Sequence, residues 1–175
     1  LHRRGCRRAS VRAPMIETLA AAIIQLAGWD GRVPLYDPFC GSGTLLCEAY
    51  MRAREMPAAV LRARFGFERF PDFDPSVWTR VREEGMRRMK PASKALIAGS
   101  DVSEAAVAAA GANCAALNAR KAVVLKVSDV FNLTGIRNHL IVCNPPYGVR
   151  LHSGKDLSPF YNRLGDFLKQ RCAGS

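Results

Sequence analysis

A glycine-rich turn between two apolar segments constrains the fold of this chain more than any other feature of its sequence. Val33 to Tyr36 is a short apolar run that predicts a buried strand, and Leu45 to Ala53 predicts a helix. The turn between them, Asp37 to Thr44, contains Gly41 and Gly43. A strand, a glycine turn and a helix in this order make the first half of a βαβ unit, so the sequence predicts a parallel sheet.

The same alternation of strand and helix continues along the 175 residues. Further elements are expected as helices over 14–27, 104–118 and 158–170, and as strands over 94–99, 122–127 and 140–143. Such alternation predicts one α/β domain, with a mostly parallel sheet covered by helices on both faces. Ligands bind beyond the carboxyl ends of the strands in these folds, and the candidate functional turns all follow predicted strands.

Residues 57–93 differ in character and are expected to form an insertion between the first and second strands. Asp74 and Pro75 predict a helix start there, and Val77 to Met89 suits a helix. The segment also carries five aromatic residues among many arginines: Phe65, Phe67, Phe70, Phe73 and Trp78. Aromatic and basic side chains together can bind RNA. We favour the simpler interpretation, in which the aromatic side chains anchor the insertion onto the core.

The balance of charges favours a polyanionic partner. Lysine and arginine number 26 against 15 aspartate and glutamate residues, which gives a formal net charge of +11. Basic side chains displace counterions from phosphates, and arginine forks onto phosphate better than lysine does. Five arginines gather near the start: Arg3, Arg4, Arg7, Arg8 and Arg12. A nucleic acid is therefore the expected partner, with a merely soluble basic surface as the alternative.

The six cysteines indicate reduced thiols rather than a metal centre or a disulfide framework. No C-x-x-C pair occurs, so no metal site is expected, and a chain of this length needs no disulfides for its core. Buried thiols of this kind are expected in a cytoplasmic protein. No apolar run approaches the roughly 20 residues of a membrane span, so no membrane partner is expected.

The glycine turn can hold an anionic group. Gly41, Ser42 and Gly43 precede a helix, whose start offers free amide donors and the positive end of a dipole. A phosphate or a carboxylate fits such a position. The turn is not a P-loop, because the Lys-Ser/Thr ending is missing, and it is not G-x-G-x-x-G, because Leu46 replaces the third glycine.

Two carboxylates follow the next two predicted strands. Asp101 is expected to accept hydrogen bonds from ribose hydroxyls, and a helix-capping carboxylate is the alternative role, which can coexist with the first. Ser103 is expected to cap the following helix. Its distance from the glycine turn exceeds the usual spacing because residues 57–93 intervene. Asp129 is a candidate for binding an adenine amino group, and a plain loop carboxylate is nearly as good an interpretation of its local sequence.

The sharpest signal is Asn144-Pro145-Pro146-Tyr147, after the fourth predicted strand. The two prolines fix a rigid turn and leave carbonyl groups as acceptors. The amide oxygen of Asn144 and a backbone carbonyl can together hold an NH2 group, while Tyr147 stacks on the base that carries it. Such acceptors aim the amine lone pair at a methyl sulfonium, by positioning and electrostatics. A rigid structural turn is the alternative.

These turns resemble those of the amino-methyltransferase branch of the Rossmann-like methyltransferases, which implies S-adenosylmethionine as methyl donor. The resemblance implies that Asn144, Pro145, Pro146 and Tyr147 form the catalytic turn, with Asn144 also contacting the donor. It implies donor contacts for the other matched residues: Asp37, Pro38, Cys40, Gly41, Ser42, Gly43 and Thr44 at the methionine end, Asp101 and Val102 at the ribose, and Asp129 and Val130 at the adenine.

Further motifs are similar to the catalytic domain of the 23S ribosomal RNA guanine-N2 methyltransferases. They are Leu1 to Gly5, Ala13-Pro14, Glu17 to Ala20, and Pro71 to Phe73 before Trp78. The resemblance implies N2-methylguanosine in 23S ribosomal RNA as product, and it makes the region of Glu17 a candidate for contacting the methionine end of the donor.

The resemblance also implies a domain organisation. Residues 1–175 are expected to be a single methyltransferase domain within a longer protein, with residues 57–93 as a family-specific insertion. A THUMP RNA-binding domain is expected to precede it, and the last three strands of the usual seven are expected beyond residue 175. One small departure from the family pattern is Cys6, which stands where a tyrosine is expected.

Other proteins share these turns. Transfer RNA guanine-N2 methyltransferases carry a similar catalytic turn, and DNA adenine-N6 methyltransferases share both turns but usually bring a target-recognition domain. Protein glutamine methyltransferases also use Asn-Pro-Pro-Tyr, although a strongly basic chain suits them less. A catalytically inactive RNA-binding fragment is the alternative from another class.

Overall fold

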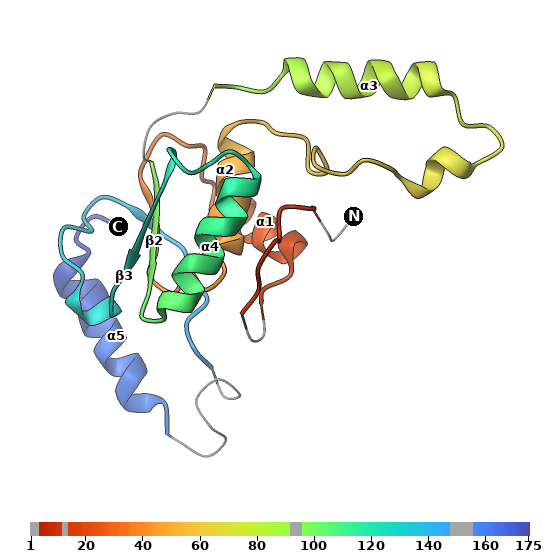
Figure 1. Ribbon diagram of the computed structural model, residues 1–175. Coiled ribbons are helices and arrows are strands. Elements are labelled where there is room, and N and C mark those ends of the chain that lie inside the picture. Colours follow the sequence, from red (N-terminus) through yellow and green to blue (C-terminus); the bar gives the residue numbers. More distant parts are fainter. Residues whose placement is uncertain (1–3, 12–13, 92–95, 148–155) are drawn as a thin grey trace.

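The computed structural model describes residues 4–11, 14–91, 96–147 and 156–175, and it confirms the α/β architecture (Figure 1). Its four strands are parallel and lie in the order β3-β2-β1-β4. They are β1 (Leu35–Asp37), β2 (Ile97–Asp101), β3 (Val123–Val127) and β4 (Leu140–Ile141). The order of the strands reverses between β1 and β4, and such a switch point opens a crevice at the carboxyl ends of the strands.

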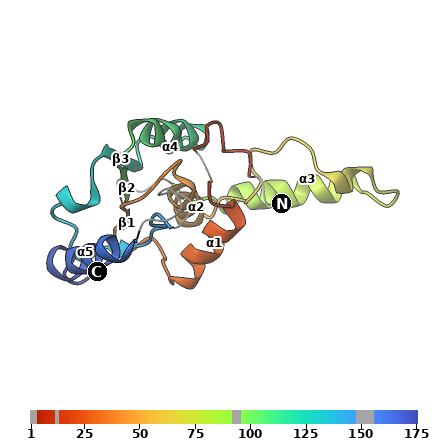
Figure 2. The ribbon, with the colours of Figure 1, turned by 90° about the horizontal axis from the view of Figure 1, so that it is seen from below.

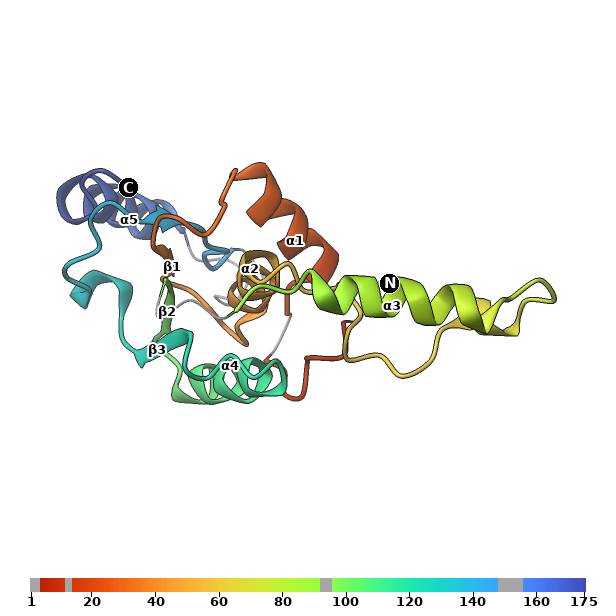
Figure 3. The same ribbon diagram turned by 90° about the horizontal axis from the view of Figure 1, so that it is seen from above.

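Helices cover both faces of the sheet, as the alternation predicts. Figures 2 and 3 show α1 (Glu17–Leu26), α2 (Thr44–Ala53) and α4 (Glu104–Ala116) on one side, and α5 (Ser158–Arg171) on the other. Two cores follow from this arrangement, because successive strand residues face opposite sides. Leu35 belongs to the core under α1, α2 and α4, whereas Tyr36 packs against the core under α5.

The first helix begins later than its sequence predicts. Pro14 suits the first helical position, but α1 starts at Glu17, and Ile16 before it has an extended backbone. The carbonyl of Met15 instead accepts a hydrogen bond of 2.6 Å from the guanidinium of Arg7. This side-chain contact holds the residues before α1 in an extended conformation. The predicted end of the helix is confirmed, with Gly28 just beyond it at a positive φ of 67°.

The first strand begins two residues later and ends one residue later than the apolar run that predicts it. The carbonyl of Val33 accepts a hydrogen bond of 2.8 Å from the indole of Trp29, which takes it out of the sheet. Asp37 closes the strand instead, paired with Gly99 of β2. The carboxylate therefore lies at the carboxyl edge of the sheet and not in the loop beyond it.

The insertion forms a small unit of its own. It contains the 3-10 helix η1 (Gly66–Arg69) and α3 (Pro75–Arg87), which begins at the predicted N-cap Asp74 and has no buried residue. Trp78 packs edge-on against Phe65 and Phe67, with ring centroids 5.1 and 4.9 Å apart. None of these rings belongs to either core, so the interpretation that they anchor the insertion onto the core is wrong. They hold η1 and α3 together in an extension that projects from the sheet (Figure 1).

The cysteines are free, as predicted, and five of the six are buried. In the described ranges no group of three or more His, Cys, Asp or Glu side chains is arranged to hold a metal ion. No helix of the described residues is long and apolar enough to cross a membrane.

Helix α2 packs closely against the sheet at Gly99. A Cβ atom there would lie 2.8 Å from Leu46 Cδ1 and 3.1 Å from the Asp37 carbonyl oxygen. We therefore expect Gly99→Ala to lower the free energy of unfolding by about 1–3 kcal/mol, because the core cannot absorb the methyl group. Urea unfolding followed by circular dichroism measures this change.

Gly111 provides the matched control. It lies inside α4, and a Cβ atom there would meet only Leu125 Cδ1 at 3.9 Å. We expect Gly111→Ala to raise the free energy of unfolding by about 0.5–1 kcal/mol, the usual gain from alanine inside a helix. Equal effects of the two substitutions would contradict the close packing at Gly99.

Candidate active site

A cavity of about 350 Å³ opens beyond the carboxyl ends of β1, β2 and β4, at the switch point of the sheet. Seven of the residues predicted to contact a donor line it: Asp37, Cys40, Gly41, Ser42, Thr44, Asp101 and Asn144. They come from segments more than one hundred residues apart in the sequence. The parallel register brings them together, because it places the ends of β1, β2 and β4 at one edge.

The glycine turn has the geometry that its sequence predicts. Gly41 and Gly43 have positive φ angles of 52° and 76°, and Gly43 is the N-cap of α2. A Cβ atom on Gly43 would lie 2.9 Å from the Cβ of Ala110 in α4. The turn therefore requires glycine at position 43 for two reasons, its left-handed backbone and its contact with α4.

Asp101 joins the turn after β1 to the end of β2. One carboxylate oxygen accepts a hydrogen bond of 3.0 Å from the Gly41 amide, and the other accepts one of 3.0 Å from the Ser103 amide. Ser103 in turn caps α4, since its hydroxyl accepts from the amide of Ala106. Each carboxylate oxygen keeps capacity for a further donor, so Asp101 can support the turn and still receive a ligand hydroxyl.

Asp37 is a buried carboxylate at the wall of the cavity, with 1% of its surface exposed. It accepts a hydrogen bond of 3.0 Å from the amide of Phe39. Burial raises the pKa of Asp37 to about 7, and the nearby negative charge of Asp101 contributes in the same direction. A cationic ligand would offset this cost, because a positive charge favours the ionised carboxylate.

The Asn-Pro-Pro-Tyr turn is fixed to helix α5. The Pro146 carbonyl oxygen accepts a hydrogen bond of 3.0 Å from the hydroxyl of Tyr161. Asn144 lines the cavity, while the ring of Tyr147 is half exposed. The turn thus presents its amide at the cavity and its aromatic ring toward the surface.

Five other residues of the predicted donor site do not line the cavity: Pro38, Gly43, Val102, Asp129 and Val130. Pro38 is buried within the turn, and Val102 is 73% exposed. Asp129 accepts a hydrogen bond of 2.9 Å from the amide of Phe131 and caps the 3-10 helix η2 (Val130–Asn132). The side chain of Val130 packs in the core under α5. A donor contact of these residues stays a prediction.

The segment before α1 contributes cavity residues that the sequence did not single out, although the family resemblance makes the neighbouring region of Glu17 a candidate. Val11, Pro14 and Met15 line the cavity, so these residues form part of its wall. Alanine-proline at 13–14 indicates only a helix start, and no periodic pattern predicts that the segment folds back over α2. The interactions that hold it are side-chain contacts to distant residues, which local sequence does not reveal.

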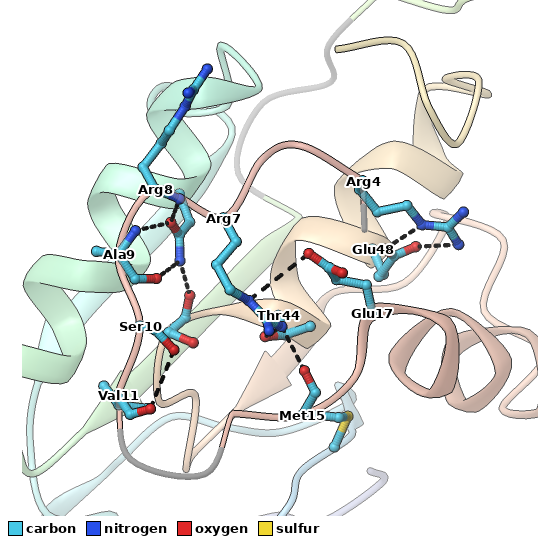
Figure 4. A network of polar contacts seen from close by, with 12 residues as sticks. Arg4, Arg7, Arg8, Ala9, Ser10, Val11, Met15, Glu17, Thr44 and Glu48 are labelled. Carbon is cyan, nitrogen blue, oxygen red and sulfur yellow. Dashed lines mark hydrogen bonds and ion pairs between the residues drawn. The ribbon is translucent and has the colours of Figure 1, made fainter. Parts of the chain in front are cut away.

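Two of the arginines near the start are used inside the molecule (Figure 4). Arg4 pairs with the buried Glu48 at 3.0 Å, and Arg7 Nε lies 3.9 Å from the buried Glu17. Arg7 also contacts the hydroxyl of Thr44 at 3.4 Å. These guanidinium groups neutralise buried carboxylates, so they are not available as part of a phosphate-binding cluster. Arg8 is exposed.

Arg3 and Arg12, the remaining members of that predicted cluster, lie outside the described residues.

The raised pKa of Asp37 makes stability depend on pH. Unfolding returns the carboxyl to its ordinary pKa of 3.8, so between pH 4 and 7 the folded state holds a proton that the unfolded state has lost. Stability must then fall as pH rises through this window. Across this window the free energy of unfolding of the wild type should fall, relative to that of Asp37→Asn, by on the order of 4 kcal/mol. Each tenfold change in proton affinity is worth about 1.4 kcal/mol.

Urea unfolding at several values between pH 4 and 8 measures this difference, and the exposed Asp72→Asn serves as the control. Parallel pH profiles for the wild type and Asp37→Asn would show that Asp37 is ionised throughout.

Comparison with known proteins agrees with this geometry. The family model described as "RMKL-like, methyltransferase domain" matches residues 4–175. A ribosomal RNA large subunit methyltransferase K/L from Vibrio parahaemolyticus is 40% identical over 180 aligned residues, covering 99% of this chain and 26% of that protein. The chain therefore spans about a quarter of the length of this curated relative.

Solved structures share the fold. A protein described as a methyltransferase complexed with SAH superposes with a TM-score of 0.86 at 33% identity, covering 96% of this chain and 44% of that one. A Listeria monocytogenes protein described as an N6-adenine-specific DNA methylase superposes with a TM-score of 0.85 at 29% identity, covering 97% of this chain and 45% of that one. These matches confirm the resemblance drawn from the sequence motifs and the Rossmann-like fold. The chain belongs to the RMKL-like methyltransferase domain family.

Proposed function

We propose that this chain transfers a methyl group from S-adenosylmethionine to the exocyclic N2 amine of a guanine in RNA, with 23S ribosomal RNA as the preferred substrate. The observation that carries the proposal is the meeting of three features at one cavity. Asp37 and Asp101 supply negative charge, the glycine turn supplies a helix start, and Asn144 supplies the amide of an Asn-Pro-Pro-Tyr turn.

The charges of the cavity suit this donor. S-adenosylmethionine carries a sulfonium and an ammonium group, and two carboxylates face the cavity of a chain whose net charge is +11. Its carboxylate fits the start of α2, where backbone amides and the helix dipole favour an anion. Its ribose hydroxyls can donate to Asp101. A relative at 33% identity is described as complexed with SAH, the product that remains when this donor loses its methyl group.

The Asn-Pro-Pro-Tyr turn supplies the groups that would bind the amine that receives the methyl group. The hydroxyl of Tyr161 already donates to the Pro146 carbonyl. We assign the Asn144 amide oxygen and the Pro145 carbonyl as the two groups that accept the N–H groups of a target amine. The nitrogen lone pair then attacks the methyl carbon, the carbon–sulfur bond breaks, and S-adenosylhomocysteine leaves. The methylated nitrogen finally loses one proton to solvent.

The RNA substrate rests on charge and on the family. A net charge of +11 favours a polyanion, and the relative named above is a ribosomal RNA large subunit methyltransferase. This assignment places the protein in the cytoplasm and makes a THUMP-type RNA-binding domain the expected neighbour in the whole protein. Transfer RNA is a second possible substrate for the same guanine-N2 reaction.

A second candidate function is DNA adenine-N6 methylation. The Listeria monocytogenes protein described as an N6-adenine-specific DNA methylase favours it. The chemistry of the acceptor amine is the same, so the base and the nucleic acid must be identified directly. Incubation with labelled donor and ribosomal RNA, transfer RNA or duplex DNA, followed by nucleoside analysis, separates N2-methylguanosine from N6-methyladenosine.

Donor binding is the first test. We expect calorimetric titration with S-adenosylmethionine to show binding that Asp101→Ala weakens about 100-fold or more, since it removes the ribose acceptor and the partner of the Gly41 amide. The exposed Asp72→Ala should bind like the wild type. A folded wild-type chain that binds no donor would refute the proposed function.

Asn144 should separate catalysis from donor binding. We expect Asn144→Ala to lower kcat for methyl transfer about 100-fold or more, because it removes one of the two groups that orient the amine. The affinity for the donor should change by less than about threefold, since the Asp101 and glycine-turn contacts remain. Equal losses in donor affinity and kcat would place Asn144 at the donor rather than at the target amine.

A further inference from the structure

We propose that Asn113 is a positioning residue that holds the N-terminal arm, residues 4–11, against the glycine turn and so completes the donor cavity. The inference rests on the proposed function, because it takes the cavity as the donor site. Asn113 lies in α4 and does not itself line the cavity. It acts on the cavity through the two segments that it joins.

The side chain of Asn113 makes four hydrogen bonds. Its amide oxygen accepts from the backbone amides of Arg8 at 2.6 Å and Ala9 at 2.9 Å. Its amide nitrogen donates to the carbonyls of Ala9 and Ser42, both at 2.9 Å. These four bonds fill the whole capacity of a carboxamide, which has two donor hydrogens and two acceptor lone pairs. One side chain therefore bonds the arm and the glycine turn at once.

The orientation of this carboxamide is determined by its partners. Both backbone amides face one end and both carbonyls face the other, so a rotation by 180° would break all four hydrogen bonds. Asn113 is also buried, with 3% of its surface exposed. Loss of the side chain would leave two amides and two carbonyls without partners in a protected position, which is costly.

Both segments that Asn113 joins reach the donor cavity. Ser42 lines it directly, and Val11 of the arm lines it two residues after Ala9. The start of the arm is fixed separately, by the ion pair of Arg4 with Glu48 and by the buried side chain of Cys6. Figure 4 shows the arm passing from Arg4 over α2 toward Val11. Asn113 is thus an anchor that bonds the arm next to Val11 and the glycine turn at Ser42.

This anchor explains how a short irregular segment can serve as a binding wall. A wall that is closed for only part of the time weakens the apparent affinity in proportion to that fraction. Three hydrogen bonds between the arm and the buried Asn113 side chain, and a fourth from that side chain to Ser42, keep the arm against the turn before the donor arrives. The energy of donor binding is then not spent on ordering the arm.

The test compares Asn113→Ala with Leu117→Ala in the full chain. Leu117 is buried at the end of the same helix, and its loss creates a cavity in the core but removes none of the hydrogen bonds that Asn113 makes to the arm. We expect Asn113→Ala to weaken the binding of S-adenosylhomocysteine about 10- to 100-fold, through loss of the closed arm. Leu117→Ala should bind within about threefold of the wild type, although it is less stable.

Two further readouts distinguish positioning from general stability. In Asn113→Ala the backbone amides of Arg8 and Ala9 should lose protection from hydrogen exchange, while those of β2 keep it. In a methyl-transfer assay the KM for S-adenosylmethionine should rise with kcat at saturation nearly unchanged. A fall in kcat at saturating donor, or donor binding equal to wild type, would overturn the inference. A wild-type chain that binds no donor would instead refute the proposed function.

Discussion

The hydrogen bond from the Gly41 amide to the Asp101 carboxylate is the contact on which the cavity depends. It joins the turn after β1 to the end of β2 at 3.0 Å, although 60 residues separate the two in sequence. Most of those 60 residues belong to the insertion, which begins after the end of α2 and ends before the start of β2. Because α2 runs from the carboxyl edge back to the amino edge, the insertion lies away from the cavity and leaves this contact undisturbed.

Charge is distributed in two opposite ways in this molecule. The chain as a whole is strongly basic, but the cavity presents Asp37 and Asp101. Part of the basic excess is also neutralised internally, where Arg4 and Arg7 meet Glu48 and Glu17. The buried carboxylates would be costly without these partners. A basic exterior and an acidic cavity suit a polyanionic substrate and a cationic donor that bind to one molecule at adjacent places.

Much of the fold was predictable from sequence, because alternating apolar runs and turn residues report local structure. The four strands, the positive-φ glycines of the turn and the cap at Ser103 follow from such local signals. The start of α1 does not follow from local signals, because a hydrogen bond from Arg7 competes with helix formation at Met15. The cavity wall formed by the arm could not be predicted for the same reason. Asn113, which holds the arm, is more than one hundred residues away from it in the sequence. Side-chain bonds between distant segments leave no periodic trace in a sequence.

The close contact between Gly43 and Ala110 restricts which residues α4 can carry where it faces the glycine turn. Helix α4 is rich in alanine, a composition that by itself suggests a helix tolerant of exchange. Its Ala110 lies so close to Gly43 that even one extra methyl group on the glycine would meet it at 2.9 Å. Enlarging either residue would push the turn away from α4 and carry the amides of α2 out of line. Position 43 should therefore stay glycine and position 110 should stay small. The small side chains of α4 determine the shape of the cavity as much as the residues that face the ligand do.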